Sequence, residues 1–367
     1  MSKTTTPREP WAIVTGDFHI KPKYRIWRTR ASPSGDIFYA IQKIVDYAKA
    51  HQITTVFLLG DIFDLPVNTS DCLAIMHLFE DFDVYFVQGQ HDRSDPPWLS
   101  ILNRPNWHHA TGAFSLHGYR LYGIDFAYDP IPMFKSLENV DVVLTHQVWS
   151  DVVPGGSISL RDVPDSISLV LSGDLHCARI LGTKPRLIFP GVPAPTSMAE
   201  FGATGFGVLY KDLSYEYIAI KSRPYYDFGC VASLEQLEQV QQQYPIVLDD
   251  ELPEALRTPV VRVTVTSPEL AAAVQERFRD THLFVELNTN TAGCTLDRTV
   301  SLQSTFTDIR QAIRQAFSGN KGNIALRLLD AVNSNTITPN TLAIVLDLLE
   351  KEWEQEESQH ASSDTAN

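Results

Sequence analysis

Five short groups of acidic and histidine residues occur along the chain, and each directly follows an apolar run rich in β-branched residues. Such runs predict buried strands, so each group falls where a strand ends and a loop begins. Loops at the carboxyl ends of buried strands are where α/β proteins build their sites. Any one group alone is more often structural, but five in order predict one shared metal centre. In chain order the groups are Asp17-x-His19, Gly60-Asp61-x-x-Asp64, Gly89-Gln90-His91-Asp92, His146 and Gly173-Asp174-x-His176.

The spacing of apolar residues predicts alternating strands and helices in the first part of the chain. Ile37, Ile41, Ile44 and Ala48 share one face of a helix over 36–51, and a strand, a helix and a strand follow at 54–59, 70–81 and 84–88. This βαβαβ beginning predicts a mostly parallel sheet. The stretch AFSLHGYRLYGIDF predicts a hairpin, and later strands are predicted at 141–145, 167–172, 186–190, 205–210 and 215–220. The strand count favours an α/β (α+β) fold of two sheets flanked by helices.

The length of 367 residues predicts more than one domain. A first domain is predicted over 1–222, and a small second domain over 223–300, where TPVVRVTV, PELAAAVQERF and HLFVEL indicate strand, helix and strand. Apolar stripes predict helices over 301–357, and such stripes form either a core or a surface that docks a partner helix. The polar segment 358–367 predicts a disordered tail.

The charge distribution bears on the substrate. A net charge of −14 argues against a generally basic nucleic-acid-binding surface. However, one stretch of ten residues directly after the first group carries five cations and no acid, namely Lys21, Lys23, Arg25, Arg28 and Arg30. A cationic strip beside an acidic metal site suits DNA, a polyanionic phosphodiester. The alternative is a solvated loop whose charges keep it exposed.

Membrane and secretory signals are lacking in the sequence. No apolar run approaches the length of a membrane span, and the N-terminus has no apolar signal core. The four cysteines show neither metal-finger spacing nor a disulfide framework. These features predict a cytoplasmic protein in a reducing compartment, with no membrane association.

The groups have the composition that a two-metal phosphoesterase centre needs. Two divalent ions clamp a phosphate and turn a bound water into hydroxide near neutral pH, and they need one carboxylate that bridges them. Asp61 is the natural bridge because it ends a buried strand and follows a glycine. His91 is left over to protonate the leaving oxygen, with Asp92 orienting its ring. The other ligand types form two sets: Asp17, His19 and His176 for one ion, and Gln90, His146 and Asp174 for the other.

The order D-x-H, G-D-x-x-D, G-N-H-D, H and G-H-x-H is the signature of calcineurin-like metallophosphoesterases, and the chain resembles that family. The segments GDIFD, LIFPGVPAPTSMAE with GFGVL, and PVVRVTV narrow the resemblance to SbcD-type nuclease subunits of bacteria or bacteriophages, called Mre-eleven in eukaryotes. The resemblance implies a DNA nuclease that uses two Mn²⁺ ions, or Mg²⁺, on the two ligand sets above. It assigns Asp64 a supporting place behind the ligands. It also implies a homodimer, a DNA-capping domain over 225–300, and terminal helices that grip an SbcC-like (Rad-fifty-like) coiled-coil ATPase.

Two departures from the family pattern fall on the same metal. Gln90 replaces an asparagine and offers the same amide oxygen on an arm one methylene longer. Asp174 replaces a histidine and adds a third carboxylate to those of Asp17 and Asp61. Hard oxygen ligands favour manganese or magnesium over zinc or copper. We expect the site to remain active with manganese; the alternative is a degenerate second site in a scaffold subunit.

Three functions compete on this sequence. The first is a manganese-dependent DNA endo- or exonuclease that processes DNA ends with an ATPase partner. The second is a phosphatase for a nucleotide or another small molecule, which would need neither the basic strip nor the capping-like domain. The third is a non-catalytic adaptor that bridges DNA and the ATPase. The basic strip, second domain and terminal helices favour the nuclease.

Overall fold

The structure is a computed structural model that describes residues 8–20, 35–64, 67, 69–100, 103–196, 204–247 and 250–288. The chain divides into two compact units, one of Met1–Val148 and Ser157–Gln303, the other of Trp149–Gly156 and Ser304–Asn367. Of the second unit only Trp149–Gly156 is described, a turn in which the Val152 and Val153 amides donate to the Trp149 carbonyl oxygen at 3.1 and 2.8 Å. The basic residues Lys21, Lys23, Arg25, Arg28 and Arg30, the segment 301–357 and the tail 358–367 lie outside the described residues.

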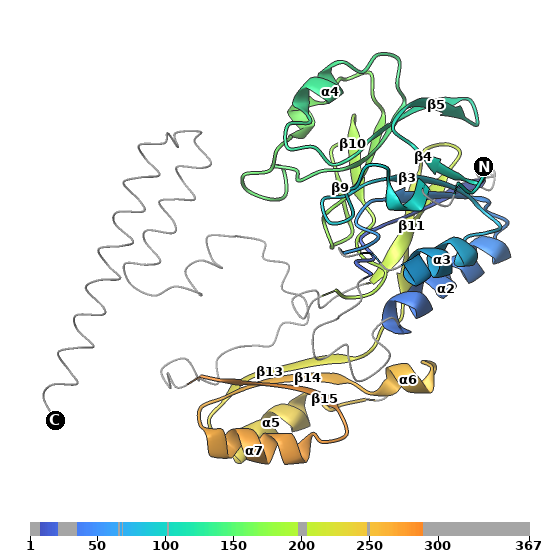
Figure 1. Ribbon diagram of the computed structural model, residues 1–367. Coiled ribbons are helices and arrows are strands. Elements are labelled where there is room, and N and C mark those ends of the chain that lie inside the picture. The colour runs from blue at the N-terminus through green and yellow to red at the C-terminus, as the bar shows by residue number, and fades with distance from the viewer. Residues whose placement is uncertain are drawn as a thin grey trace, which may run out of the picture. The chain divides into compact units, whose positions relative to one another are not determined.

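The first of two six-stranded sheets has the order β12-β11-β1-β2-β3-β4 (Figure 1). β1 to β4 run parallel, and β11 and β12 add antiparallel strands beside β1. Helices α2 (Gly35–Ala50) and α3 (Thr69–Leu78) lie side by side and pack on one face of this sheet. Its strands are β1 (Pro10–Thr15), β2 (Thr55–Leu59), β3 (Asp83–Val87), β4 (Trp107–His109), β11 (Thr204–Tyr210) and β12 (Tyr215–Ile220).

The second sheet has the order β5-β6-β7-β8-β10-β9. Its inner strands are parallel, and the edge strands β5 and β9 are antiparallel to their neighbours. Its strands are β5 (Gly112–Leu116), β6 (Tyr119–Ile124), β7 (Val142–His146), β8 (Leu169–Gly173), β9 (Arg179–Leu181) and β10 (Arg186–Phe189), and the short helix α4 spans Ile131–Lys135. One buried cluster takes Val14 and Phe57 from the first sheet and Leu144 and Leu171 from the second, so the sheets pack face to face. The predicted two-sheet α/β fold flanked by helices is confirmed.

Local sequence explains these elements. The residues predicted to share a face of α2, Ile37, Ile41, Ile44 and Ala48, are each at most 2% exposed. β2, β7 and β8 are buried at every position, as parallel strands covered on both faces are. The hairpin turns at His117 and Gly118, whose φ angles of +50° and +85° are those of a two-residue turn between antiparallel strands.

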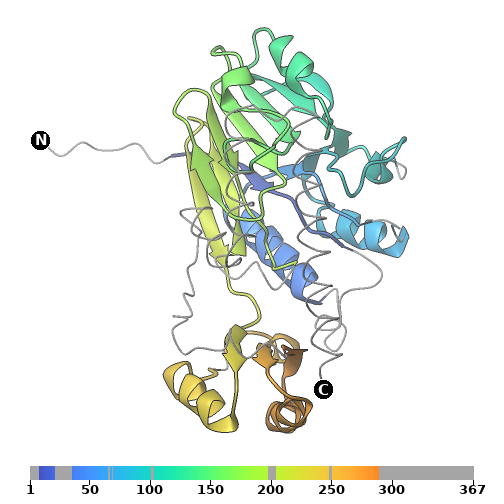
Figure 2. The same cartoon turned by 90° about the vertical axis from the view of Figure 1, so that its left-hand side faces the viewer.

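A third, smaller sheet is built from β13 (Tyr225–Val231), β14 (Val260–Val265) and β15 (His282–Leu287), all parallel. Helices α5 (Leu234–Gln243) and α7 (Pro268–Arg277) pack on one face of it around a separate apolar core, and the short α6 spans Glu254–Arg257 (Figure 2). The Leu270 amide donates to the Ser267 side chain, which caps α7. The predicted strand–helix–strand order is confirmed, whereas β13 was not predicted. The boundary at 222 stays a prediction.

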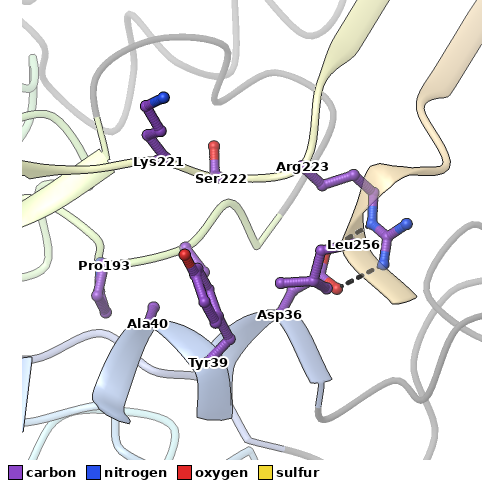
Figure 3. Close-up of a pocket in the computed structure, with 9 residues that line it drawn as sticks. Asp36, Tyr39, Ala40, Pro193, Lys221, Ser222, Arg223 and Leu256 are labelled. Atoms are coloured by element: carbon purple, nitrogen blue, oxygen red, sulfur yellow. Dashed lines mark hydrogen bonds and ion pairs between the residues drawn. The ribbon is translucent and has the colours of Figure 1, made fainter. Parts of the chain in front are cut away.

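Arg223, between β12 and β13, joins the small sheet to the larger body. Its guanidinium donates to both carboxylate oxygens of Asp36 at 2.9 and 2.8 Å (Figure 3). It also donates to the Thr258 carbonyl oxygen at 2.7 Å. Asp36 begins α2 and Thr258 precedes β14. Arg223 is only 3% exposed. A buried charge is stable in a protein only with such partners, so the Arg223 guanidinium depends on Asp36 and Thr258.

The structure also bears on the predicted state of the cysteines and on membrane spans. Cys230 in β13 is disulfide-bonded, so the prediction of cysteines without disulfides is wrong at this position. Of the helices in the described ranges, none combines the length and the hydropathy needed to cross a bilayer.

Candidate metal centre

The five groups meet where the carboxyl ends of strands from both large sheets come together. β1, β2 and β3 deliver the first three groups, and β7 and β8 deliver the other two. Backbone hydrogen bonds bind the first two groups to each other, because the amides of Asp17 and His19 donate to the carbonyl oxygens of Gly60 and Asp61, each at 2.9 Å. The Asp174 amide donates to the Asp17 carboxylate at 3.1 Å, which joins the two sheets at the centre.

The backbone at the centre is strained. Asp17, His19, Asp61 and Asp174 have φ angles of +52°, +47°, +49° and +82°. Left-handed conformations of non-glycine residues cost on the order of 1–3 kcal/mol each and gather at functional sites. Four such residues at one point indicate that the fold holds these side chains in place for a purpose other than stability.

Two glycines allow the groups to approach each other. A Cβ on Gly89 would lie 1.9 Å from Asp61 Oδ1, and a Cβ on Gly173 would lie 2.5 Å from His146 Nδ1. Real Cβ atoms do not come so close to other heavy atoms, so no other residue fits without displacing a predicted ligand. The packing of the centre therefore requires the glycines that open the third and fifth groups, Gly89 and Gly173.

Asp61 lies in the middle of the histidines. Its Oδ2 is 3.4 Å from His146 Nε2, 3.7 Å from His19 Nε2 and 4.0 Å from His91 Nε2, and its Oδ1 accepts the His91 amide at 2.9 Å. Burial alone would raise the pKa of Asp61, but the contact with His146 and the charges of His146 and His19 lower the pKa below its ordinary value. The carboxylate is therefore ionised and faces three ring nitrogens.

The three residues predicted as the first ligand set, Asp17, His19 and His176, come together in the structure. They offer three ligand atoms that lie within 4.8 Å of one another. His19 Nε2 is 3.1 Å from His176 Nε2, and His176 Nε2 is 3.9 Å from Asp17 Oδ1. His19 Nδ1 lies 2.8 Å from Asp64 Oδ1. Because a carboxylate oxygen accepts, His19 Nδ1 donates to Asp64, and Nε2 is the ring nitrogen that faces the centre.

The second ligand set lies around His146. Asp17, Asp61 and His146 offer ligand atoms within 4.8 Å of one another, and Asp174 Oδ1 is 3.9 Å from His146 Nε2. The Gln90 side-chain amide donates to Asp174 Oδ1 at 2.8 Å. The two residues that depart from the family pattern are thus direct hydrogen-bond partners.

The donor chemistry of the centre fits cations. His146 Nδ1 lies 2.6 Å from the Leu59 carbonyl oxygen and must donate to it, so Nε2 of the neutral ring has only a lone pair. That nitrogen faces carboxylates, which also only accept. Within the described part of the chain, His146 Nε2 and Asp17 Oδ2 are buried without a hydrogen-bond partner. Only a proton or a metal ion satisfies such atoms together.

The pKa values at the centre reflect the same excess of hydrogen-bond acceptors over donors. Burial alone would lower the pKa of His146, but Asp61 and Asp17 outweigh it and raise the pKa to about 10. Burial is also the largest influence on Asp17 and raises its pKa. Without cations the centre therefore takes up protons to balance its carboxylates, and divalent ions would take the place of those protons.

Asp64 contacts two histidines, and this corrects the role predicted for Asp92. Asp64 Oδ1 lies 2.8 Å from His19 Nδ1 and 3.3 Å from Nδ1 of the half-exposed His91. Asp92 instead accepts the amides of Ile62 and Gly89 at 2.7 and 2.8 Å. Its oxygens are used by the backbone of the loops, so the neighbouring carboxylate that orients His91 is Asp64.

Residues 11–178 match the family model of calcineurin-like phosphoesterases. This span contains every predicted ligand. No curated protein sequence matches the chain.

Two solved structures resemble the phosphoesterase fold at low similarity. The protein TT1561 of Thermus thermophilus is 14% identical, with a TM-score of 0.42, and the match covers 57% of this chain and 98% of that one. A dimetal phosphatase from Danio rerio is 12% identical, with a TM-score of 0.39, and the match covers the same shares.

A further network supports the phosphoesterase centre and was not predicted. The Gln88 amide donates to Asp125 Oδ1 at 2.7 Å, and His109 Nε2 lies 2.8 Å from Asp125 Oδ2. Ser94 donates its amide to the Gln88 side-chain oxygen at 2.8 Å. Asp125 directly follows β6, an apolar strand, just as the five groups follow theirs. That pattern was the available signal for a sixth position at this edge.

Proposed function

We propose that the chain is a divalent-metal-dependent phosphodiesterase that cuts DNA. The convergence of ring nitrogens and carboxylates around Asp61 carries the hydrolytic part of the proposal, because these groups are ligand types for divalent ions and divalent ions would replace the protons that otherwise balance them. When bound, two divalent ions polarise the phosphoryl group and make hydroxide available at that pH.

The chain's own residues would divide the remaining work. Asp64 holds the rings of His19 and His91 through their Nδ1 atoms. His91 is half exposed at the edge of the centre, with its Nε2 4.0 Å from Asp61. From there it would deliver a proton to the oxygen that leaves when the ester bond breaks. The His91 amide also fixes Asp61 by donating to Oδ1.

We propose manganese as the working metal, with magnesium as a second choice. The second ligand set would hold its ion through the oxygens of Asp61, Gln90 and Asp174 and one histidine nitrogen, which is a hard set of donors. Manganese titration followed by calorimetry tests both ligand sets at once. Two ions per chain are expected; one ion at saturation would support the degenerate-site alternative.

DNA as substrate rests on the sequence. The cationic strip of residues 21–30 would meet the phosphates of a strand, and the resemblance to SbcD-type subunits implies the same substrate. We also propose that the chain works as a homodimer with an SbcC-like coiled-coil ATPase through its C-terminal helices. Deleting residues from Thr341 onward should then weaken ATPase binding and leave cleavage intact. An undiminished association would exclude this docking.

Hydrolysis of two substrates separates the candidate functions. We expect the protein with manganese to cut a labelled hairpin oligonucleotide, and Asp61→Asn, as the matched control, to cut nothing. Activity only on a generic aryl phosphate would replace the nuclease by a small-molecule phosphatase. If wild type cut neither substrate with Mn²⁺, and His91→Ala left DNA binding and ATPase binding unchanged, the non-catalytic adaptor would be correct.

A further inference from the structure

The loop after β6 presents an exposed aromatic ring that is linked to the candidate metal centre through one other ring. Tyr128 is 84% exposed, more than any other large apolar side chain in the described ranges. Its ring meets Phe126 edge-on, with centroids 5.3 Å apart. The Phe126 ring in turn lies 6.5 Å from that of the predicted ligand His146. A line of three rings therefore leads from the centre to the surface.

This loop is held in place rather than left free. The Gln147 side chain, fully buried, donates to the Asp125 carbonyl oxygen at 2.9 Å and accepts the Ala127 amide at 3.4 Å. The Phe126 amide donates to the Gln88 carbonyl oxygen at 2.9 Å, and the Asp125 carboxylate accepts the Gln88 amide at 2.7 Å. The loop is thus tied to the ends of β3 and β7, close in sequence to the predicted ligands Gln90 and His146. An anchored ring binds with less loss of conformational entropy than a free one.

The charge beside the ring indicates what it would bind. Asp129 follows Tyr128 and is also exposed, so a phosphate group would be repelled at this point. An uncharged planar group would not be repelled. An exposed tyrosine offers a flat face on which any nucleobase stacks without regard to sequence.

We propose that Tyr128 stacks on a nucleobase of the substrate next to the scissile phosphate. This inference rests on the proposed phosphodiesterase function and deepens it, because it identifies a group of the substrate that is recognised apart from its phosphates. Stacking on Tyr128 would make base-bearing strands better substrates than abasic strands of the same charge.

The test compares a short single-stranded oligodeoxynucleotide with an abasic strand of equal length. Binding is measured by fluorescence anisotropy with Ca²⁺ in place of Mn²⁺, and cleavage is measured with Mn²⁺. The variants are Tyr128→Ala, Tyr128→Phe, which keeps the ring, and Leu287→Ala, an exposed apolar control that is 52% exposed in β15. Because Tyr128 is exposed, its replacement should leave folding intact.

Tyr128→Ala should weaken binding of the base-bearing strand and raise its KM by about 5- to 150-fold, the range for loss of one stacked base. Binding of the abasic strand should change less than about twofold, and Tyr128→Phe and Leu287→Ala should match wild type. An equal response of both strands to Tyr128→Ala, or no response, overturns the inference. Wild-type protein that cleaves no phosphodiester would instead overturn the proposed function, and the binding ratio would still decide the role of Tyr128.

Discussion

Binding of Mn²⁺ to the centre should release a proton from His146, and the affinity should rise with pH. In the cation-free fold the pKa of this ring is raised from 6.5 to about 10, mainly because Asp61 and Asp17 outweigh the effect of burial. The proton therefore stabilises the cation-free protein fully below pH 6.5, and that stabilisation is lost as the pH rises toward about 10. A metal ion on Nε2 must displace it.

The loss of metal affinity through proton competition is set by the difference between the working pH and the pKa of His146. A pH of 7.5 lies between two and three units below that pKa, so displacing the proton lowers the apparent affinity by a factor on the order of 10²–10³. Each unit of pH between about 6.5 and 10 should then raise the affinity of that ion roughly tenfold.

Calorimetry in two buffers of different ionisation enthalpy counts the released protons. We expect about one proton per ion bound at the second ligand set at pH 7.5, and none from this position in His146→Ala. His77→Ala serves as the matched control, because the His77 side chain is 77% exposed. Manganese affinity that stays constant between about pH 6.5 and 8, with no proton released, would refute the reasoning.

Five other substitutions test the centre and the contact of Arg223 with Asp36. Asp61→Asn should reduce manganese affinity at both positions by more than the 10- to 100-fold typical of an outer-shell partner, as calorimetry would show. His91→Ala should keep two ions but slow cleavage by roughly 10²–10⁴-fold in single-turnover assays. Gln90→Asn and Asp174→His should be non-additive in manganese affinity, because their side chains are hydrogen-bonded. Arg223→Ala should lower the free energy of unfolding by about 3–5 kcal/mol in urea, because it leaves the Asp36 carboxylate without its partner.

The features that were predicted correctly depend on local pattern. The buried face of α2 and the hairpin of β5 and β6 each follow from residues a few positions apart. The meeting of the five groups could also be predicted, because the carboxyl ends of neighbouring parallel strands share one edge of a sheet. β13 was not predicted, since its sequence YYDFGCV includes an acid and a glycine within the strand.

Side-chain partners depend on how loops meet in space. For this reason the residue next to His91 in the sequence was wrongly predicted to be its partner. Asp92 is adjacent to His91 in the chain, yet its oxygens face the Ile62 and Gly89 amides. Asp64 comes from a different loop, the one in which Asp61 has a φ of +49°, and its Oδ1 lies 3.3 Å from His91 Nδ1. No local signal distinguishes these two carboxylates, because both follow a group of ligand types after a buried strand.

The pairing of Gln90 with Asp174 bears on whether the second ligand set is degenerate. Considered separately, each departure from the family pattern would weaken a metal position. In the structure the longer glutamine arm brings its amide nitrogen to Asp174 Oδ1 at 2.8 Å. An ionised carboxylate can only accept, so the amide must donate, which leaves the glutamine oxygen as its remaining acceptor. An asparagine would not reach as far, and a histidine at 174 would not add the negative charge. The two departures therefore form one matched change, and this argues for a ligand set adapted to hard divalent ions.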